Sequence, residues 1–125
     1  MNAHHAVVWI DHTEARIFRF VGEDTIEKLD VHSSLHGHFR NKHASTAHRS
    51  EDHPFHHEVI DAVKDAEEFL VVGPGKAKLE LVRAIHKQHK EMDARLVGVE
   101  TVDHPTDNQL LAFARGYFRR VDALR

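Results

Sequence analysis

The N-terminal part of the chain consists of short apolar runs separated by polar turns. Val7 to Ile10 form one uninterrupted apolar run, which is typical of a strand buried on both faces. Residues 15–21 and 25–31 predict two further strands, and the turn-forming sequences at 11–14 and 22–24 separate the three. Connections this short favour an antiparallel meander.

In the second half of the chain, apolar residues recur at helical spacing. A helix is predicted after Asp52, its candidate N-cap, with Pro54 in the first turn. The apolar run Phe69 to Val72 then predicts a strand that ends at Gly73-Pro74-Gly75, and a helix is expected from about 76 to 92. This part of the chain therefore alternates helix and strand.

The C-terminal part predicts one more strand and one more helix. Residues 95–102 fit a strand, and Thr106 and Gln109 form a capping box that opens the last helix. The expected apolar face of that helix consists of Leu110, Ala114, Tyr117 and Val121. The predicted order is β-β-β, a long connection, then α-β-α-β-α. Because a helix joins the late strands, they should be parallel, which predicts an α/β fold with a mixed sheet flanked by helices.

The composition of the chain limits the classes of protein to which it can belong. The 125-residue chain is 41% hydrophobic and 30% charged, which is typical of a globular protein, so we expect residues 1–125 to form a single domain. It contains no cysteine, which excludes disulfides and thiolate chemistry and is typical of a cytoplasmic protein. No apolar run approaches the roughly 18 residues of a membrane span, and the N-terminus has no signal-peptide pattern. The formal net charge of −3 argues against non-specific coating of nucleic acid, so neither DNA nor a membrane is an expected partner.

Histidine is concentrated between the third predicted strand and the first predicted helix. The chain has 14 histidines, and eight of them lie between His32 and His57. The span at about 33–54 shows no apolar periodicity and is longer than ordinary connections inside a compact domain. We interpret it as a mobile functional loop.

This His-rich loop supports two interpretations. One is a metal site, because neutral imidazoles at these spacings can share one ion, with zinc or nickel as the metal. Its candidate ligands are His36, His38, His53, His56 and His57. The other is contact with RNA, because Arg40, Lys42 and Arg49 surround the histidines and Phe39 can stack on a base.

Basic residues at two other places suggest anion binding. The Gly73-Pro74-Gly75 turn is followed by Lys76 and Lys78, and backbone amides at a helix start favour anions. The alternative is a tight turn in which glycine permits close packing and Glu80 offsets the lysines. The last helix is basic toward its end, which suits either the helix dipole or a phosphate-contacting patch. Its basic residues are Arg115, Arg119 and Arg120.

Asp11 ends the first strand, where it could serve a metal-dependent hydrolase. A two-metal site needs several carboxylates that converge. The conceivable partners are Glu58, Asp61 and Asp103, although their spacing does not require convergence. An acidic residue in a turn is also common without any catalytic role.

Two segments carry a resemblance to a known group of proteins. Residues 8–18 are similar to the opening hairpin of the ribonuclease-H-like domains in the translational machinery superfamily. Residues 69–75, with Lys78, are similar to the strand, Gly-Pro-Gly and helix junction of the same domains. That group includes the middle domain of archaeal and eukaryotic class I release factors, and Pelota. The chain also resembles small bacterial relatives of these proteins.

The resemblance implies a three-layer α/β fold with strand order 3-2-1-4-5, and a role in translation with the ribosome or tRNA as partner. In the release factors the long connection after the third strand carries a Gly-Gly-Gln tripeptide. Here Gly37 is the only glycine of that span, and the tripeptide does not occur in the chain. Peptidyl-tRNA hydrolysis is therefore not expected.

We expect a non-catalytic, translation-related accessory protein that contacts RNA or the ribosome. The expected RNA- or anion-binding residues are Arg40, Lys42, Arg49, Lys76 and Lys78. The alternatives are a histidine-based metal-binding or pH-sensing protein, and a hydrolase that uses Asp11.

Overall fold

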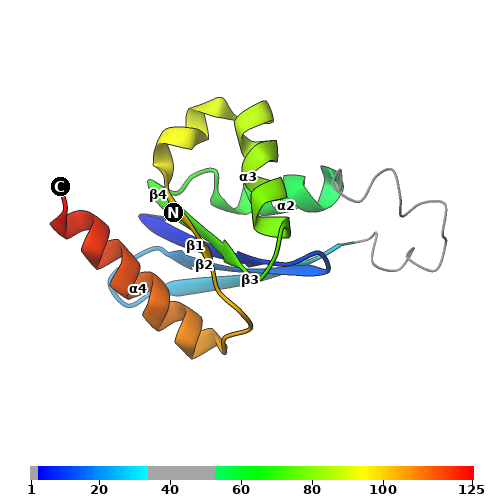
Figure 1. Cartoon of the computed structure of the whole chain (residues 1–125). Coiled ribbons are helices and arrows are strands. Elements are labelled where there is room, and N and C mark those ends of the chain that lie inside the picture. The colour runs from blue at the N-terminus through cyan, green and yellow to red at the C-terminus, as the bar shows by residue number, and fades with distance from the viewer. Residues whose placement is uncertain (1–2, 34–52) are drawn as a thin grey trace, which may run out of the picture.

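The computed structural model describes residues 3–33 and 53–125 and builds them around one sheet (Figure 1). Its strands lie in the order β3-β2-β1-β4-β5. They are β1 (His5–Ile10), β2 (Glu14–Phe20), β3 (Ile26–His32), β4 (Glu68–Gly73) and β5 (Leu96–Thr101). The β1–β2 and β2–β3 pairs are antiparallel, whereas the β1–β4 and β4–β5 pairs are parallel. The predicted mixed five-stranded sheet and its strand order are therefore confirmed.

Helices cover both faces of this sheet. α2 (His53–Val63) and α3 (Ala77–Gln88) lie on one face, and α4 (Asp107–Ala123) lies on the other (Figure 1). A three-ten turn, Lys90–Arg95, connects α3 to β5. The predicted three-layer α/β arrangement is confirmed. No helix within the described ranges is long and apolar enough to cross a membrane.

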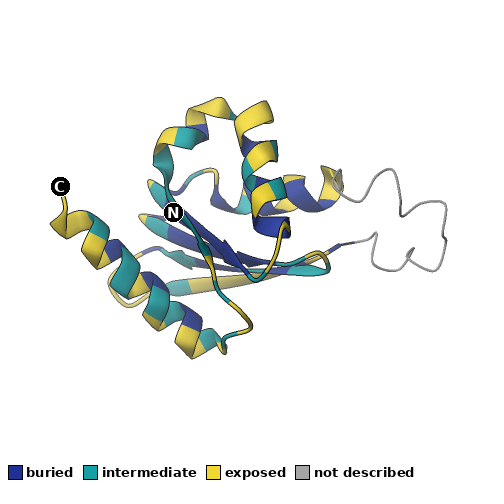
Figure 2. Cartoon of the chain, in the orientation of Figure 1, coloured by how far each residue is buried: buried dark blue, intermediate teal, exposed yellow. Residues whose placement is uncertain are grey.

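The central strands β1 and β4 are buried on both faces, as their uninterrupted apolar runs predict (Figure 2). Val8 and Ile10 of β1 belong to the apolar core beneath α2 and α3. Val7 and Trp9 belong to a second core beneath α4. β4 divides its residues between the two cores in the same alternating way. The two apolar layers hold the sheet rigidly, so that the loops at its ends are positioned by a packed scaffold.

The predicted end of the second helix needs correction. α3 ends at Gln88 and not at 92, because His89 leaves the helical region with φ −143° and ψ 61°. The three-ten turn that follows buries Met92, which explains why this apolar residue continued the predicted helical stripe. The capping box predicted at Thr106 and Gln109 is present.

The apolar face of α4 also differs from the predicted one. Leu110 and Ala114 are fully buried as expected, and Phe118 continues the stripe one turn later. The other two predicted positions, Tyr117 and Val121, are only half-buried. Four-residue spacing from Leu110 leads to Phe118, which puts Tyr117 at the rim of the buried face.

Candidate functional site

Three residues that the sequence suggests as functional, Asp11, Lys76 and Lys78, lie where the parallel strands end. β1 leads into Asp11, and β4 leads into the turn from Gly73 to Lys76. Ser33, after β3, is attached to the same edge because its amide donates to the Thr13 carbonyl at 2.9 Å. We refer to this edge as the carboxyl edge. In open α/β sheets, ligands bind outside the carboxyl ends of the strands, which makes it the first place to examine.

Asp11 is held inside its own turn. Its Oδ1 atom accepts hydrogen bonds from the Thr13 amide at 2.9 Å, the Thr13 hydroxyl at 3.0 Å and the Glu14 amide at 2.9 Å. Burial by itself raises the pKa of Asp11, but the hydrogen bonds outweigh it, and the pKa lies below its ordinary value. The other oxygen, Oδ2, lies 3.8 Å from the His104 Nε2 atom. The carboxylate therefore stabilises the turn between β1 and β2.

The other carboxylates considered for a hydrolase do not join Asp11. Glu58 and Asp61 lie exposed on α2. The Asp103 side chain meets the His104 Nδ1 atom at 2.8 Å. Among the residues that the structure describes, the group of His, Asp and Glu side chains close enough to share one ion contains none of these four acids. These four acids therefore do not form the kind of shared carboxylate site that a two-metal hydrolase needs.

The turn after β4 is shaped by packing. A side chain at Gly73 would place its Cβ 2.2 Å from the Ile10 carbonyl oxygen, so glycine is required where β4 passes β1. Lys78 is only 8% exposed, and its Nζ atom donates to the Gly75 carbonyl at 2.6 Å. Lys76, by contrast, is exposed. Of the two lysines predicted to bind an anion, Lys78 holds the turn and Lys76 presents its charge to solvent.

The structure describes three of the five predicted histidine ligands, His53, His56 and His57. Outside the described ranges lie Asp52, His36, His38, Arg40, Lys42 and Arg49. At the start of α2, His53 and His57 are exposed one turn apart. His56 is 6% exposed, and its ring centroid lies 6.0 Å from that of Phe55. The helix therefore directs His56 inward, away from the other two.

A cluster that sequence reasoning missed attaches the start of α4 to the sheet. The Trp9 indole donates to the Asp103 carbonyl at 2.6 Å, and the Arg16 guanidinium lies 4.7 Å from the centre of the Trp9 ring. Arg16 and Lys28 both donate to the Asp107 carboxylate, at 2.9 and 2.7 Å. The hydrogen bond from Lys28 is the main reason why the pKa of Asp107 is lowered. Arg16 and Asp107 are 91 residues apart in sequence, so no local pattern predicts their pairing.

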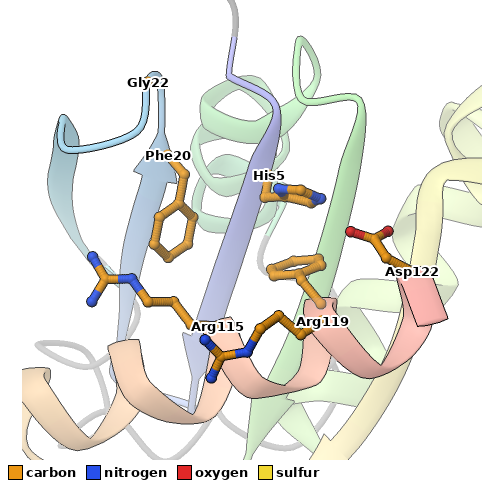
Figure 3. Close-up of a pocket in the computed structure, with 7 residues that line it drawn as sticks. His5, Phe20, Gly22, Arg115, Arg119 and Asp122 are labelled. Atoms are coloured by element: carbon orange, nitrogen blue, oxygen red, sulfur yellow. The ribbon is translucent and has the colours of Figure 1, made fainter.

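The opposite edge of the sheet, the amino edge, contains an open pocket of about 250 Å³ (Figure 3). His5 begins β1, Phe20 ends β2, and Gly22 lies in the turn that follows. The remaining lining comes from α4, as Arg115, Phe118, Arg119 and Asp122. We call this the amino-edge pocket. In the sequence, only the basic end of the last helix pointed to this pocket, because the lining residues from β1 and β2 are distant from that helix along the chain.

Three side chains beside this pocket lie close enough to share a metal ion. They are His5, Glu68 and Asp122, whose ligand atoms all lie within 4.8 Å of one another. The Arg125 guanidinium already pairs with Glu68 and lies 3.7 Å from Asp122. Burial is the main reason why the pKa of His5 is lowered, and Asp122 acts in the opposite direction. A metal ion would have to displace Arg125, so the arrangement favours an ion-pair cluster over a metal centre.

Comparison with known proteins places the fold. No family model matches the sequence, and no curated protein matches it. Among solved structures, the Pelota protein of Thermoplasma acidophilum has a TM-score of 0.62 and 17% identity, over 90% of this chain and 32% of that one. The archaeal translation termination factor aRF1 has a TM-score of 0.55 and 14% identity, over 82% of this chain and 31% of that one. Archaeoglobus fulgidus Pelota has a TM-score of 0.52 and 16% identity, over 86% and 29%.

These matches show a shared fold. The chain is an α/β domain of the kind found in archaeal Pelota and aRF1, which supports the resemblance seen in the sequence at the level of a distant structural relationship. It spans less than a third of the length of each of these proteins, with coverage of 29% to 32%. Their activities and partners therefore do not transfer to this chain through the fold.

Proposed function

We propose that this chain is a non-catalytic, translation-related accessory protein that contacts RNA or the ribosome in the cytoplasm. The observation that carries the proposal is the fold that the chain shares, over most of its length, with part of archaeal Pelota and of the termination factor aRF1. The sequence contains no Gly-Gly-Gln, which is why the proposal includes no peptidyl-tRNA hydrolysis.

The contact surface in this proposal is the His-rich span between β3 and α2, together with the carboxyl edge. The cations that the span contributes are Arg40, Lys42 and Arg49. Its flanking residue Ser33 is attached to the carboxyl edge through Thr13, and Lys76 is exposed at that edge. Such cations favour phosphate contacts. Lys78 assists indirectly, because its bond to Gly75 holds the turn that presents Lys76.

The direct test is binding of fluorescent tRNA and of ribosomes by the full chain across a salt series. Affinity should fall as salt rises, because each phosphate contact releases counterions. Replacing Arg40, Lys42 and Arg49 together with Ala should weaken binding. It should also reduce the slope of log affinity against log salt by roughly 2, since each cation that neutralises a phosphate of a single strand accounts for about 0.7 of that slope.

A matched control removes the same charge from another surface. Arg83, Lys87 and Lys90 are all exposed on the α3 side of the molecule, and their triple Ala variant should bind as the unmodified chain does. Equal losses in both triple variants would indicate general electrostatic attraction. Absence of any salt-sensitive affinity for tRNA and ribosomes would end the proposal.

One observation supports histidine-based metal binding as a second proposal. His53 and His57 are both exposed and lie one turn apart on α2, a spacing at which two imidazoles can bind one ion. His36 and His38 supply further candidate ligands from the sequence, and zinc or nickel suits imidazole. His56 is left out of the test variant because its burial would confound a loss of ligand with a loss of stability.

Elemental analysis and a zinc titration on untagged protein, never exposed to a metal column, test this second proposal. Near-stoichiometric metal that is lost in a variant with His36, His38, His53 and His57 replaced by Ala would support it. Replacement of the exposed His12 and His86 serves as the control and should leave the metal content unchanged. A metal-free protein with only weak zinc affinity would contradict it.

A further inference from the structure

The amino-edge pocket combines two exposed arginines with aromatic surface. Arg115 and Arg119 lie one turn apart on α4, and both line the pocket. The Arg115 guanidinium carbon lies 5.7 Å from the centre of the half-buried Phe20 ring. Figure 3 shows both arginines extending from α4 below Phe20 and His5. Two guanidinium groups and an apolar wall therefore border the same open volume.

These two arginines differ from three others that lie beside the sheet. Arg16, Arg19 and Arg125 each pair with a carboxylate. In the part of the chain that the structure describes, no carboxylate forms an ion pair with Arg115 or Arg119. Like charges one helical turn apart repel each other modestly, so an anion bound between them would relieve that repulsion.

The two acidic residues beside the pocket, Glu68 and Asp122, are already close to other cations. Glu68 pairs with Arg125 and lies 3.3 Å from the His5 Nε2 atom. Asp122 lies 3.7 Å from Arg125. The excess positive charge of the pocket is thus located at Arg115 and Arg119, on the side of the Phe20 ring.

The chemistry of the lining defines a class of ligand. The planar fork of arginine matches the oxygens of a phosphate group, and two arginines line this pocket. Phe20 is edge-to-face with Phe118, with 6.4 Å between the ring centroids, and the His5 and Phe118 centroids lie 4.2 Å apart. These rings supply aromatic surface against which a ring can pack. A volume of about 250 Å³ is slightly below the roughly 300 Å³ at which ordinary small-molecule sites begin, which limits the ligand to a small one.

We propose that the amino-edge pocket binds a phosphate monoester that carries a planar ring, such as a mononucleotide. This chemistry has two sources, a free nucleotide and the phosphorylated end of a single-stranded RNA. The pocket lies at the opposite end of the sheet from Ser33 and Lys76. The inference is therefore independent of the contact surface proposed above, and either can fail without the other.

The test is a titration of the isotope-labelled full chain, followed by amide chemical shifts. Adenosine monophosphate, inorganic phosphate and adenosine are added in separate series. Adenosine monophosphate should shift signals confined to residues 20–22 and 115–122, with inorganic phosphate and adenosine each binding at least about fivefold more weakly because each lacks one half of the recognised group.

Variants of the pocket separate its two halves. Arg115→Gln and Arg119→Gln should each weaken binding of adenosine monophosphate about tenfold or more, since each removes a charge-assisted hydrogen bond. Phe20→Leu should weaken the binding of adenosine monophosphate about fivefold and leave the binding of inorganic phosphate unchanged. Arg120→Gln is the matched control, because Arg120 lies over the Tyr117 ring at 5.6 Å and does not line the pocket.

A short single-stranded RNA with a terminal phosphate distinguishes the two sources. Binding of this RNA with the same dependence on Arg115 and Arg119, and more tightly than the nucleotide, identifies an RNA end as the ligand. Binding of the nucleotide without the RNA identifies a free nucleotide. The proposal is overturned if neither binds at these residues, if inorganic phosphate binds as tightly as adenosine monophosphate, or if Arg120→Gln causes an equal loss. The triple variant of Arg40, Lys42 and Arg49 should retain full nucleotide binding.

Discussion

The two edges of the sheet use their charged residues in opposite ways. At the carboxyl edge, Asp11 accepts hydrogen bonds from its own turn, and buried Lys78 donates to the Gly75 carbonyl. At the amino edge, Arg115 and Arg119 are exposed around an open pocket. Asp11 and Lys78, which the sequence suggested as functional, therefore have structural roles, whereas two arginines that dipole compensation could explain border an open pocket.

This difference follows from how each edge satisfies its backbone. A turn at the end of a strand leaves carbonyl and amide groups without partners in the flanking elements. Lys78 and Asp11 are close enough in sequence to reach such groups at Gly75 and Thr13, and they are bound there. Arg115 and Arg119 lie in the second half of α4 but before its last turn, where the helix satisfies its own backbone, so their charges stay available.

The strongest way to break the carboxyl edge is Gly73→Ala. The added Cβ would lie 2.2 Å from the Ile10 carbonyl oxygen, and this backbone atom cannot move without separating β1 from β4. We expect the free energy of unfolding to fall by about 3 kcal/mol or more, measured by chemical denaturation. Gly75→Ala is the control, because nothing lies within 4 Å of a Cβ there. Its effect should lie between zero and a gain of about 1 kcal/mol, and an equal loss would place the cause in the turn rather than in the close approach to Ile10.

The next effect separates the two lysines of that turn. Lys78→Met leaves the Gly75 carbonyl without its donor, and we expect a loss of about 2 kcal/mol in the free energy of unfolding. Lys76→Met should change it by less than about 0.5 kcal/mol, because Lys76 is exposed. Urea denaturation of both variants provides the measurement. Similar values would mean that Lys78 does not hold the turn.

Asp11 should show a smaller effect that depends on pH. Asp11→Ala removes the acceptor of the turn and should cost about 1 kcal/mol at neutral pH, whereas Asp11→Asn keeps an acceptor oxygen and should cost less. The pKa of Asp11 in the folded chain lies below its ordinary value of 3.8. Its contribution to stability is therefore present above that value and is lost as pH falls through the folded pKa. The stability of Asp11→Asn should fall less steeply than that of the unmodified chain below about pH 4, and parallel acid limbs would refute this role.

The smallest effect is expected at the amino edge. The double variant of Arg115→Gln and Arg119→Gln should change the free energy of unfolding by less than about 0.5 kcal/mol, because neither residue is buried or forms an ion pair within the described part of the chain. Thermal denaturation of this double variant and of Lys78→Met under the same conditions provides the measurement. A loss as large as that of Lys78→Met would assign these arginines to the fold and remove the contrast between the two edges.

Much of the fold could be predicted because it depends on neighbours in sequence. The apolar runs of β1 and β4 predict strands that are buried on both faces, and the capping box of Thr106 and Gln109 marks the start of α4. The local pattern did not predict where α3 ends, because the apolar Met92 is buried within a three-ten turn and not within the helix. The strand order was predicted with the help of a family resemblance, since local patterns do not reveal which strands pair.

The candidate sites were predicted less completely, for a physical reason. Sequence reasoning located Lys76, Lys78 and Asp11 at the ends of strands, but it could not say which of them would be buried and bound to a carbonyl or amide. It identified the arginines of the last helix but not the pocket that they line, because His5 and Phe20 complete that lining from a distant part of the chain. Burial and convergence depend on the packing of distant segments.

The sequence by itself determined most of the strands and helices, the glycine turn after β4 and the absence of thiol chemistry, because each depends on residue types at short range. The tertiary structure alone decided which charges are used internally. It pairs Arg16 with Asp107 across 91 residues, buries Lys78 and brings the start of β1 to the second half of α4. Contacts of this kind form only when the two apolar cores bring the sheet and its helices together, and no single stretch of the chain contains that information.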